Sequence, residues 1–324
     1  MRCDFEPCFF FQNMKSIRIR GVVPPVCTPL TAAGQVDEAA IPRIVDHLVA
    51  GGCDAAFFLG STGEIPSLTR EARETVIRSA VAAAAGRIPI LVGISDNCGK
   101  ETLALARLAT RLGADAVVMC APSFYELSQD ELARYFTSII PELEVPVLVY
   151  NMPWLTGHVL GRECLRAVLE HPQIIGFKDS SGDLSYLKEM VEVAGTRAGT
   201  TVLVGNEYCY LDGLRLGANG VVGGGGNIYP ELFRSLQDAF DRGDLNEASR
   251  FQEQINNLGE GLFQITGRPS SVFCAVKGGM AAMGLCEAYM APPLTSCTPA
   301  QVDEIRRFFS GRLQGLSIGA NAVA

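Results

Sequence analysis

The chain has 324 residues, of which 48% are hydrophobic and 19% are charged, and its formal net charge at pH 7 is −8. A chain of this size and apolar content can bury a large core, and an α/β barrel of about 250 residues with an addition fits within it. The negative charge offers no basic surface for nucleic acid or for an anionic membrane, so a small-molecule function is favoured.

The 11 cysteines are scattered along the chain, and no two of them have the C-x-x-C spacing of a zinc or redox site. An odd number of cysteines, several of them in apolar segments, is typical of free thiols in a reducing compartment. No apolar run reaches the roughly 18 residues that are needed to cross a bilayer. We therefore expect a cytoplasmic protein without a membrane partner.

The first residues carry an acidic residue and a proline where a signal peptide has its charged and apolar regions. We expect residues 1–17 to be a disordered or wrongly assigned leader, with Met14 as an alternative start. Residues 313–324 are expected to form a flexible tail.

Short apolar runs recur along the chain, and each is followed by a longer segment with helical periodicity, which indicates βα units around a parallel sheet. The predicted strands are residues 20–26, 55–60, 88–94, 116–121, 145–151, 174–179, 201–205 and 220–223. Helices are predicted between them, for example at 70–85, 100–112, 129–140 and 184–194. Gly113 and Gly217 each end a helix directly before the next strand.

Eight such units, each of about 25 residues, favour a closed (β/α)8 barrel over an open doubly wound sheet. The open sheet would need a dinucleotide fingerprint after the first strand, and residues 24–29 contain no glycine. After residue 223 the pattern is purely helical, with segments at 231–241, 246–262 and 270–283 and another helix from Thr298. We predict a TIM barrel over residues 18–241 and a C-terminal helical extension over residues 242–312.

Residues that directly follow the predicted strands are candidates for chemistry, because the carboxyl ends of the strands form the working face of such a barrel. Lys178 follows the apolar run 174–177. A desolvated lysine has a lowered pKa and can attack a carbonyl to form a Schiff base, whereas the alternative is a lysine that extends into solvent. By the alternation of a strand, Lys178 is predicted to share a face with Gly176 and Ile174, and Gly176 leaves room beneath it.

Two further groups lie at the ends of other predicted strands, Tyr150 at the end of the adjacent strand 145–151 and Ser61-Thr62 after the strand 55–60. Tyr150, which shares a face with Leu148, can act as an acid or base or can only hydrogen-bond. Ser61 and Thr62 stand between glycines, so backbone N–H groups there can hold a carboxylate and the hydroxyls can relay a proton, with an ordinary turn as the alternative. The three histidines have no metal-ligand spacing. A metal-dependent aldolase is therefore poorly supported.

Three segments carry a family resemblance: residues 60–64 (GSTGE), 150–153 (YNMP) and 176–183 (GFKDSSGD). Their sequences and separations resemble the dihydrodipicolinate synthase / N-acetylneuraminate lyase family, from about Arg20 to Phe309. The resemblance implies a (β/α)8 barrel with a C-terminal helical part, assembled as a homotetramer of two dimers or as a dimer. It also implies a Schiff base with pyruvate or a 2-oxo acid, and no metal or organic cofactor.

The same resemblance assigns roles to residues. It implies that Lys178 is the Schiff-base nucleophile, that Tyr150 moves the proton on the substrate oxygen, and that Thr62 assists this relay. A protonated imine is an electron sink, so it stabilises the enamine that remains when the carbon–carbon bond breaks. The predicted substrate contacts are Ser61, Thr62, Gly205, Glu207, Val222 and Leu155.

Some positions depart from the family pattern. The synthases place an arginine where this chain has Leu155, and leucine cannot pair with the carboxylate of the aldehyde partner. The sialic acid lyases have a paired Asp-Glu where this chain has Asn206 and Glu207, and a serine where it has Gly224. Residues 223–226 are four consecutive glycines, and the absence of side chains there also suggests a close approach of the backbone to another group. Trp154 is expected to line the pocket or to pack at its rim, and the synthase aromatic that crosses a dimer interface corresponds to Phe124 or Tyr125.

These features favour an aldolase or lyase that interconverts a 2-oxo acid with pyruvate and an aldehyde. The 2-oxo acid is expected to be of the 2-keto-3-deoxy sugar acid, hydroxy-oxo acid or sialic acid type. The alternatives are 4-hydroxy-tetrahydrodipicolinate synthase, a 2-keto-3-deoxy acid dehydratase, and a non-enzymatic barrel that binds a keto acid as a regulator. The presence of both Lys178 and Tyr150 argues against the last of these.

Overall fold

The structure, a computed structural model, describes residues 17–313, so the predicted leader and tail lie outside the described residues except at their inner ends. Eight parallel strands form one sheet in the order β1-β8-β7-β6-β5-β4-β3-β2. The strands are β1 (Gly21–Val22), β2 (Ala56–Phe58), β3 (Ile90–Gly93), β4 (Ala116–Cys120), β5 (Val147–Asn151), β6 (Ile174–Asp179), β7 (Thr201–Val204) and β8 (Gly220–Val221). Each predicted strand contains one of them.

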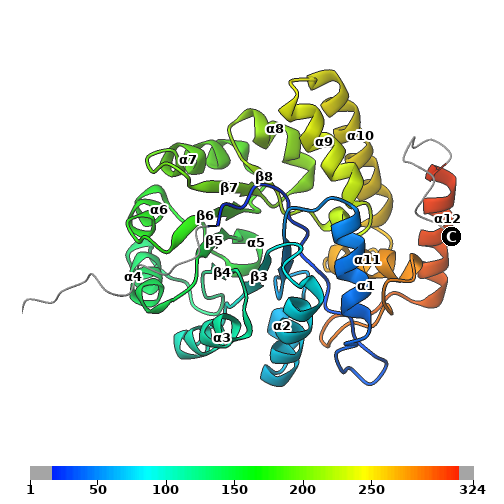
Figure 1. The fold of residues 1–324 in the computed structure, drawn as a ribbon, viewed down its shortest axis with the longest axis horizontal. Coiled ribbons are helices and arrows are strands. Elements are labelled where there is room, and N and C mark those ends of the chain that lie inside the picture. Colours follow the sequence, from blue (N-terminus) through cyan, green and yellow to red (C-terminus); the bar gives the residue numbers. More distant parts are fainter. Residues whose placement is uncertain (1–16, 314–324) are drawn as a thin grey trace, which may run out of the picture.

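The sheet closes on itself between β1 and β2. β1 pairs with β8, and Pro25, beyond the end of β1, forms a parallel bridge with Phe57 of β2. The Val26 N–H donates to the Phe57 carbonyl at 2.8 Å, which completes the closure. β1 is shorter than the predicted strand 20–26 because Pro24 and Pro25 have no N–H to donate. The predicted TIM barrel is confirmed, and Figure 1 shows the ring of strands inside its helices.

Eight helices follow the strands up to β8: α1 (Ala40–Ala50), α2 (Arg70–Ala84), α3 (Gly99–Leu112), α4 (Gln129–Ile139), α5 (Pro153–Thr156), α6 (Arg162–Leu169), α7 (Leu184–Ala194) and α8 (Tyr210–Arg215). Short 3-10 turns lie at η2 (Ile65–Ser67), η3 (Ile140–Glu142), η4 (Glu207–Cys209) and η5 (Gly224–Asn227). Local sequence fixes several helix starts. Ser128 and Glu131 form a reciprocal capping box at α4, and the Asp183 side chain accepts two N–H groups at α7.

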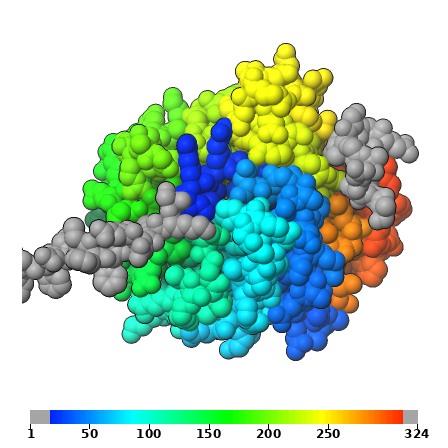
Figure 2. All heavy atoms as spheres, in the orientation of Figure 1, coloured from blue at the N-terminus to red at the C-terminus, as the bar shows by residue number. Residues whose placement is uncertain are grey.

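After β8 the chain is helical, as predicted. The helices there are α9 (Pro230–Asp241), α10 (Leu245–Leu262), α11 (Ser271–Ala282) and α12 (Pro299–Leu313). Figures 1 and 2 show these helices, coloured yellow to red, gathered on one side of the molecule. Within residues 17–313, no helix has the length and apolar character to span a bilayer.

The interior of the barrel holds its own apolar cluster, formed by every second side chain of the strands. Its members on β5 and just after it are Leu148, Tyr150 and Met152. The β5–β6 register is interrupted by a bulge, because Val147 pairs with Ile174 whereas Leu148 pairs with Gly176. Ile174 therefore packs in the outer core, and the prediction that it shares a face with Lys178 is wrong. A bulge inserts one residue and shifts the alternation after it.

Gly176 has a second reason to be glycine besides the room that it leaves beneath Lys178. A Cβ atom on this residue would lie 2.2 Å from the carbonyl oxygen of Thr201 on β7. The backbones of β6 and β7 approach so closely here that no side chain fits.

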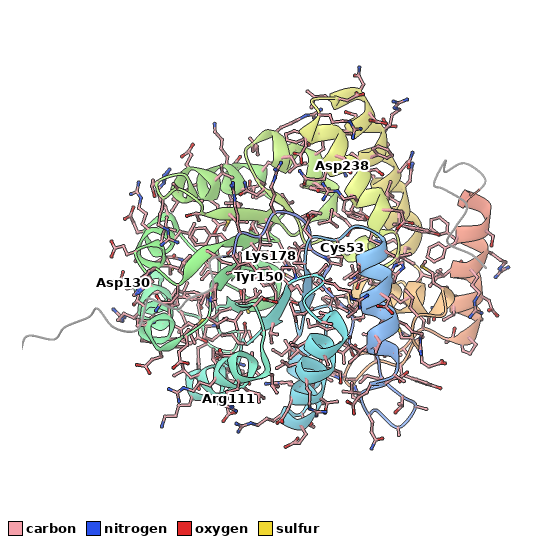
Figure 3. All side chains as sticks on the ribbon, in the orientation of Figure 1. Cys53, Arg111, Asp130, Tyr150, Lys178 and Asp238 are labelled. Atoms are coloured by element: carbon pink, nitrogen blue, oxygen red, sulfur yellow. The ribbon has the colours of Figure 1, made fainter. Side chains whose placement is uncertain are left out.

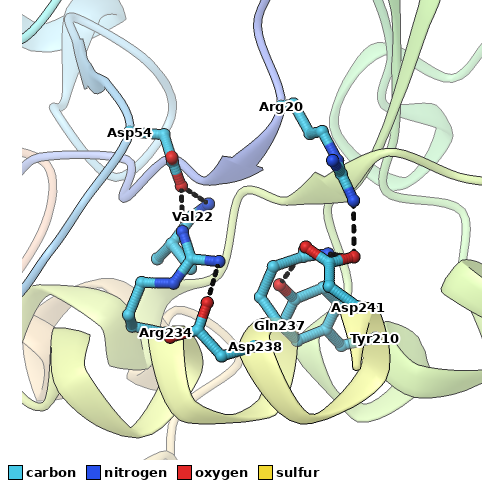
Figure 4. Close-up of polar contacts among 8 residues, drawn as sticks. All are labelled: Arg20, Val22, Asp54, Tyr210, Arg234, Gln237, Asp238 and Asp241. Atoms are coloured by element: carbon cyan, nitrogen blue, oxygen red, sulfur yellow. Dashed lines mark hydrogen bonds and ion pairs between the residues drawn. The ribbon is translucent and has the colours of Figure 1, made fainter. Parts of the chain in front are cut away.

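An ion-pair network ties α9 to the amino ends of the first strands (Figure 4). Asp54, just before β2, accepts the Val22 N–H of β1 at 2.8 Å and pairs with Arg234 of α9 at 2.9 Å. Arg234 also pairs with Asp238 at 2.7 Å. This network lies at the end of the barrel opposite to the strand ends that carry Tyr150 and Lys178.

Candidate active site

Lys178 and Tyr150 are direct partners in the β5–β6 register, so their side chains lie on the same side of the sheet, and Tyr150 belongs to the apolar cluster inside the barrel. The Lys178 ammonium lies 3.9 Å from the centroid of the Tyr150 ring and 5.0 Å from that of the Phe57 ring. Figure 3 shows Lys178 and Tyr150 inside the ring of strands, whereas Arg111 and Asp130 lie on the outer helices. Lys178 is only 5% exposed, so it is buried under aromatic rings and does not extend into solvent.

Burial gives Lys178 the character of a nucleophile. It lowers the pKa of the amine to about 7, and this shift is only partly opposed by Cys120 and Asp179. Asp179 follows Lys178 in the strand and therefore faces the other side of the sheet. Its carboxylate accepts hydrogen bonds from the Asn151 amide at 2.8 Å and from the Ser181 hydroxyl at 2.7 Å. The adjacent carboxylate is thus bound elsewhere and does not neutralise the amine.

The Tyr150 hydroxyl lies 3.1 Å from the Ser180 hydroxyl and 2.9 Å from the Met152 sulfur. Burial raises the pKa of Tyr150 above its usual range, and the Ser180 and Ser61 hydroxyls oppose this shift. The phenol therefore carries its proton at neutral pH and has hydroxyl groups beside it through which a proton can pass.

Ser180 was not among the predicted site residues, although the sequence contains a signal for it. It lies two residues after Lys178 and so shares its face of the strand. A Cβ atom at Gly205 would lie 1.9 Å from the Ser180 hydroxyl oxygen. Gly205, one of the predicted substrate contacts, therefore leaves the space that the Ser180 side chain occupies beside Tyr150.

A cavity of about 370 Å³ opens above Lys178. Its polar floor contains Ser61, Thr62, Tyr150, Lys178 and Ser180. Of the predicted site residues, those that line the cavity are Lys178, Tyr150, Ser61, Thr62, Gly205, Glu207 and Val222. The structure thus gathers these residues from five strand ends around one space, which is large enough for a small 2-oxo acid.

Leu155 is the predicted contact that the structure does not bring to the cavity. It lies on the short helix α5, is 43% exposed, and is not among the residues that line this space. Its neighbour Trp154 lines the cavity instead and stacks on Phe273 of α11, with ring centroids 5.9 Å apart. The Trp154 indole N–H also donates to the Ser180 carbonyl at 3.2 Å, which fixes the ring at the cavity wall.

The outer wall of the cavity comes from the C-terminal helices and was not predicted. Phe263 follows α10, and Val272, Phe273 and Val276 lie on α11. These residues are remote in sequence from the strand-end motifs, and their apolar periodicity is the same as that of any packed helix.

Glu207 is a buried carboxyl group that lines the cavity. One oxygen, Oε2, accepts the Gly225 N–H at 2.9 Å, and the other, Oε1, has no hydrogen-bond partner within the described part of the chain. Burial raises the pKa of Glu207 to about 7, against the opposing effect of the Gly225 and Gly224 N–H groups. A Cβ atom at Gly225 would lie 2.7 Å from Oε1, so the predicted close approach to the glycine run is confirmed.

Among residues 17–313, no three or more His, Cys, Asp and Glu side chains form a group that could hold a metal ion. His158, one of the three histidines, is buried and its Nε2 contacts the Tyr125 carbonyl oxygen at 2.9 Å.

Comparison with known proteins identifies the family. The sequence model of the dihydrodipicolinate synthetase family matches residues 18–310. The chain belongs to this family. Its members are aldolases and synthases of the lyase class that form a lysine Schiff base with pyruvate, without a metal or organic cofactor.

The similar proteins carry more than one activity. YagE of Escherichia coli K12, which has the provisional name 2-dehydro-3-deoxy-D-gluconate aldolase, is 32% identical over 74% of this chain and 80% of its own length. A 4-hydroxy-tetrahydrodipicolinate synthase of Thermomicrobium roseum is 33% identical over 89% of this chain and 92% of its own. The specific reaction must therefore be inferred from the pocket.

Solved structures agree with the fold. YagE in complex with pyruvate has a TM-score of 0.84 at 28% identity and covers 90% of this chain and 98% of its own. The dihydrodipicolinate synthase of Bacteroides thetaiotaomicron has a TM-score of 0.88 at 33% identity, with 92% and 100% covered.

Proposed function

We propose that this chain is a class I aldolase or lyase that interconverts a 2-oxo acid with pyruvate and an aldehyde through a Schiff base on Lys178. The observation that carries this proposal is the pairing of a desolvated Lys178 with a protonated Tyr150 beneath a cavity of small-ligand size. The 2-oxo acid is of the 2-keto-3-deoxy sugar acid, hydroxy-oxo acid or sialic acid type.

The proposed reaction begins when the neutral Lys178 amine attacks the keto carbon of the substrate. Tyr150 supplies the proton with which the former carbonyl oxygen leaves as water, and an iminium ion remains. Ser61 and Thr62 hold the substrate carboxylate through hydroxyl and backbone N–H groups, and Thr62 assists the relay.

Cleavage then moves the electrons of the C3–C4 bond into the iminium ion and forms an enamine. The C4 hydroxyl loses its proton to the Tyr150 oxygen and becomes the carbonyl of the released aldehyde. Protonation of the enamine and addition of water to the imine release pyruvate and restore the Lys178 amine.

The function is tested by incubating the protein with 2-oxo acids of different chain length and measuring the pyruvate released. A 2-keto-3-deoxy acid that loses water without releasing pyruvate would indicate the dehydratase. Condensation of pyruvate with aspartate semialdehyde would indicate the synthase, which the exposed Leu155 does not favour because it offers no charge to a second carboxylate. Binding of a keto acid without turnover would indicate the regulatory barrel.

The pH dependence of Schiff-base formation provides a prediction. Only the neutral amine attacks, and the pKa of Lys178 is about 7, so the rate is expected to rise from pH 5 to 7 and to level off by about pH 8. An ordinary lysine, with a pKa of about 10.4, would give a rate that still rises beyond pH 9. Initial rates of borohydride trapping with pyruvate distinguish the two curves, and a continuing rise would contradict a desolvated amine.

Glu207→Gln tests the part of the cavity that receives the rest of the substrate. Glutamine keeps the shape and can still accept the Gly225 N–H, but it removes the negative charge that the carboxyl group offers to a substrate hydroxyl at the cavity wall. We expect KM for hydroxylated 2-oxo acids to rise by roughly tenfold, as for the loss of one hydrogen bond to a charged group. Pyruvate trapping should change little. An equal effect on substrates with and without distal hydroxyls would exclude this role.

We further propose that the protein is cytoplasmic and that it assembles as a homotetramer or dimer. Phe124 and Tyr125, in the loop between β4 and α4, are 79% and 71% exposed and pack edge to face with ring centroids 5.2 Å apart. Two adjacent exposed aromatic rings are typical of an interaction surface.

A further inference from the structure

A fully buried ion pair joins the 60–64 turn to the C-terminal helices. Glu64 follows β2, Lys277 lies on α11, and both side chains are 0% exposed. The Lys277 ammonium donates to Oε1 of Glu64 and also to the Tyr289 carbonyl at 2.8 Å. The other oxygen of Glu64, Oε2, accepts the Ala291 N–H at 2.7 Å. Both carboxylate oxygens are therefore bound to the C-terminal part of the chain.

Glu64 also belongs to the turn that presents Ser61 and Thr62 to the cavity. Its φ of 60° lies in the left-handed region, which costs free energy for a residue with a side chain. Its N–H donates to the Ser61 carbonyl at 3.0 Å, so a change in the position of Glu64 is passed directly to Ser61. A turn that holds an unfavourable backbone conformation requires a partner outside itself, and Lys277 is that partner.

The other member of the pair is connected to the opposite wall of the cavity. Val276 precedes Lys277 on α11, Phe273 lies one turn earlier, and both line the cavity. A buried ion pair thus connects the Ser61-Thr62 turn to the wall formed by α11.

Stability alone is a weak reason for this arrangement. The cost of removing two charges from water largely cancels their attraction, and well-packed apolar side chains at the same places stabilise a fold equally well or better. An ion pair adds geometric specificity, because the carboxylate and the ammonium must meet at a defined distance and angle.

We propose that Glu64 and Lys277 are positioning residues that hold the Ser61-Thr62 turn at the separation from α11 that fits the carboxylate end of a 2-oxo acid. Neither residue lines the cavity, so they act through Ser61 and Val276. This inference rests on the proposed function, in which Ser61 and Thr62 bind that carboxylate.

Three variants test the proposal. Glu64→Gln keeps the size of the side chain but turns an NH2 group toward the Ala291 N–H or the Lys277 ammonium. Lys277→Met removes the ammonium and leaves a buried carboxylate unpaired, which lowers stability. The double variant Glu64→Gln/Lys277→Met removes both charges, so it is expected to fold even where Lys277→Met does not.

The measurement is the pyruvate concentration that half-saturates borohydride trapping, determined by intact mass below the Tm of each variant. We expect this concentration to rise about tenfold in Glu64→Gln and in the double variant, because a small misplacement of a binding group weakens its contacts. The trapping rate at saturating pyruvate should stay within about twofold, since Lys178 and Tyr150 are untouched.

Arg234→Met is the matched control. It breaks the ion pair with Asp54 at the amino end of the barrel, where α9 meets β1 and β2 (Figure 4). We expect a lower Tm with unchanged half-saturation by pyruvate. Wild-type half-saturation in Glu64→Gln and the double variant, or the same rise in Arg234→Met, would overturn the positioning role. A wild-type chain that forms no adduct on Lys178 would instead overturn the proposed function.

Discussion

Lys178→Ala is expected to lower pyruvate release by at least about 10⁴-fold, because no other group can replace a covalent nucleophile. In the wild-type chain, borohydride and pyruvate should add a reduced pyruvyl group to the peptide that contains Lys178, and the variant should lack this adduct. Peptide mass spectrometry after reduction measures both. Lys188→Ala, on the exposed face of α7, is the control and should be labelled as the wild type is.

The loss of activity in Lys178→Ala should not be caused by unfolding. The pKa of Lys178 is about 7 in the folded chain, below the value of about 10.4 for a lysine in an unfolded chain. The unfolded state therefore binds more protons between these two values, so the contribution of Lys178 to stability rises with pH across this window. Below pH 7 Lys178 is charged in both the folded and the unfolded chain, so its burial lowers the free energy of unfolding by the full amount. The alanine variant has no charge to bury at this position. A Tm of the variant at pH 6 close to the wild-type value would agree, whereas an adduct on another peptide would contradict the assignment.

The sequence predicts the inner part of the site well because it depends on a simple rule of geometry. Parallel strands end at the same face of a barrel, so Tyr150 and Lys178, each near the end of an apolar run, must lie close together. The same rule brings Ser61 and Thr62 to that face. The alternation of a strand would also have found Ser180, two residues beyond Lys178.

Other parts of the structure depend on contacts that no local pattern encodes. The β5–β6 bulge reverses the side of Ile174, and nothing in the run 174–177 distinguishes a strand with a bulge from one without. Phe273 and Lys277 belong to an apolar helical segment, and only the packing of α11 over the barrel shows that they face the cavity wall and Glu64. The outer wall of the cavity is formed by the C-terminal helices, and this is therefore the part of the site that cannot be predicted from the sequence.

Tyr150→Phe is expected to lower kcat by about 10²- to 10⁴-fold, the usual contribution of a positioned proton donor and acceptor. Phenylalanine keeps the ring that lies 3.9 Å from the Lys178 ammonium, so the burial that lowers the pKa of the amine is retained. The adduct with pyruvate should still form, but slowly, because dehydration of the first addition product lacks its proton donor. Steady-state kinetics and the time course of borohydride trapping measure the two effects.

Ser180→Ala distinguishes the contribution of the Tyr150 phenol from that of its hydrogen bond with Ser180. This variant removes the hydroxyl that lies 3.1 Å from the Tyr150 oxygen but leaves the phenol in place. The loss of one neutral hydrogen bond is expected to lower kcat by only about tenfold. If Tyr150→Phe retains the wild-type kcat, the proton must move through Thr62 or through water, and the role of Tyr150 is limited to covering Lys178. A large loss in Tyr150→Phe with a small loss in Ser180→Ala assigns the proton transfer to the phenol, because the two variants share the broken hydrogen bond and differ in the group that carries the proton.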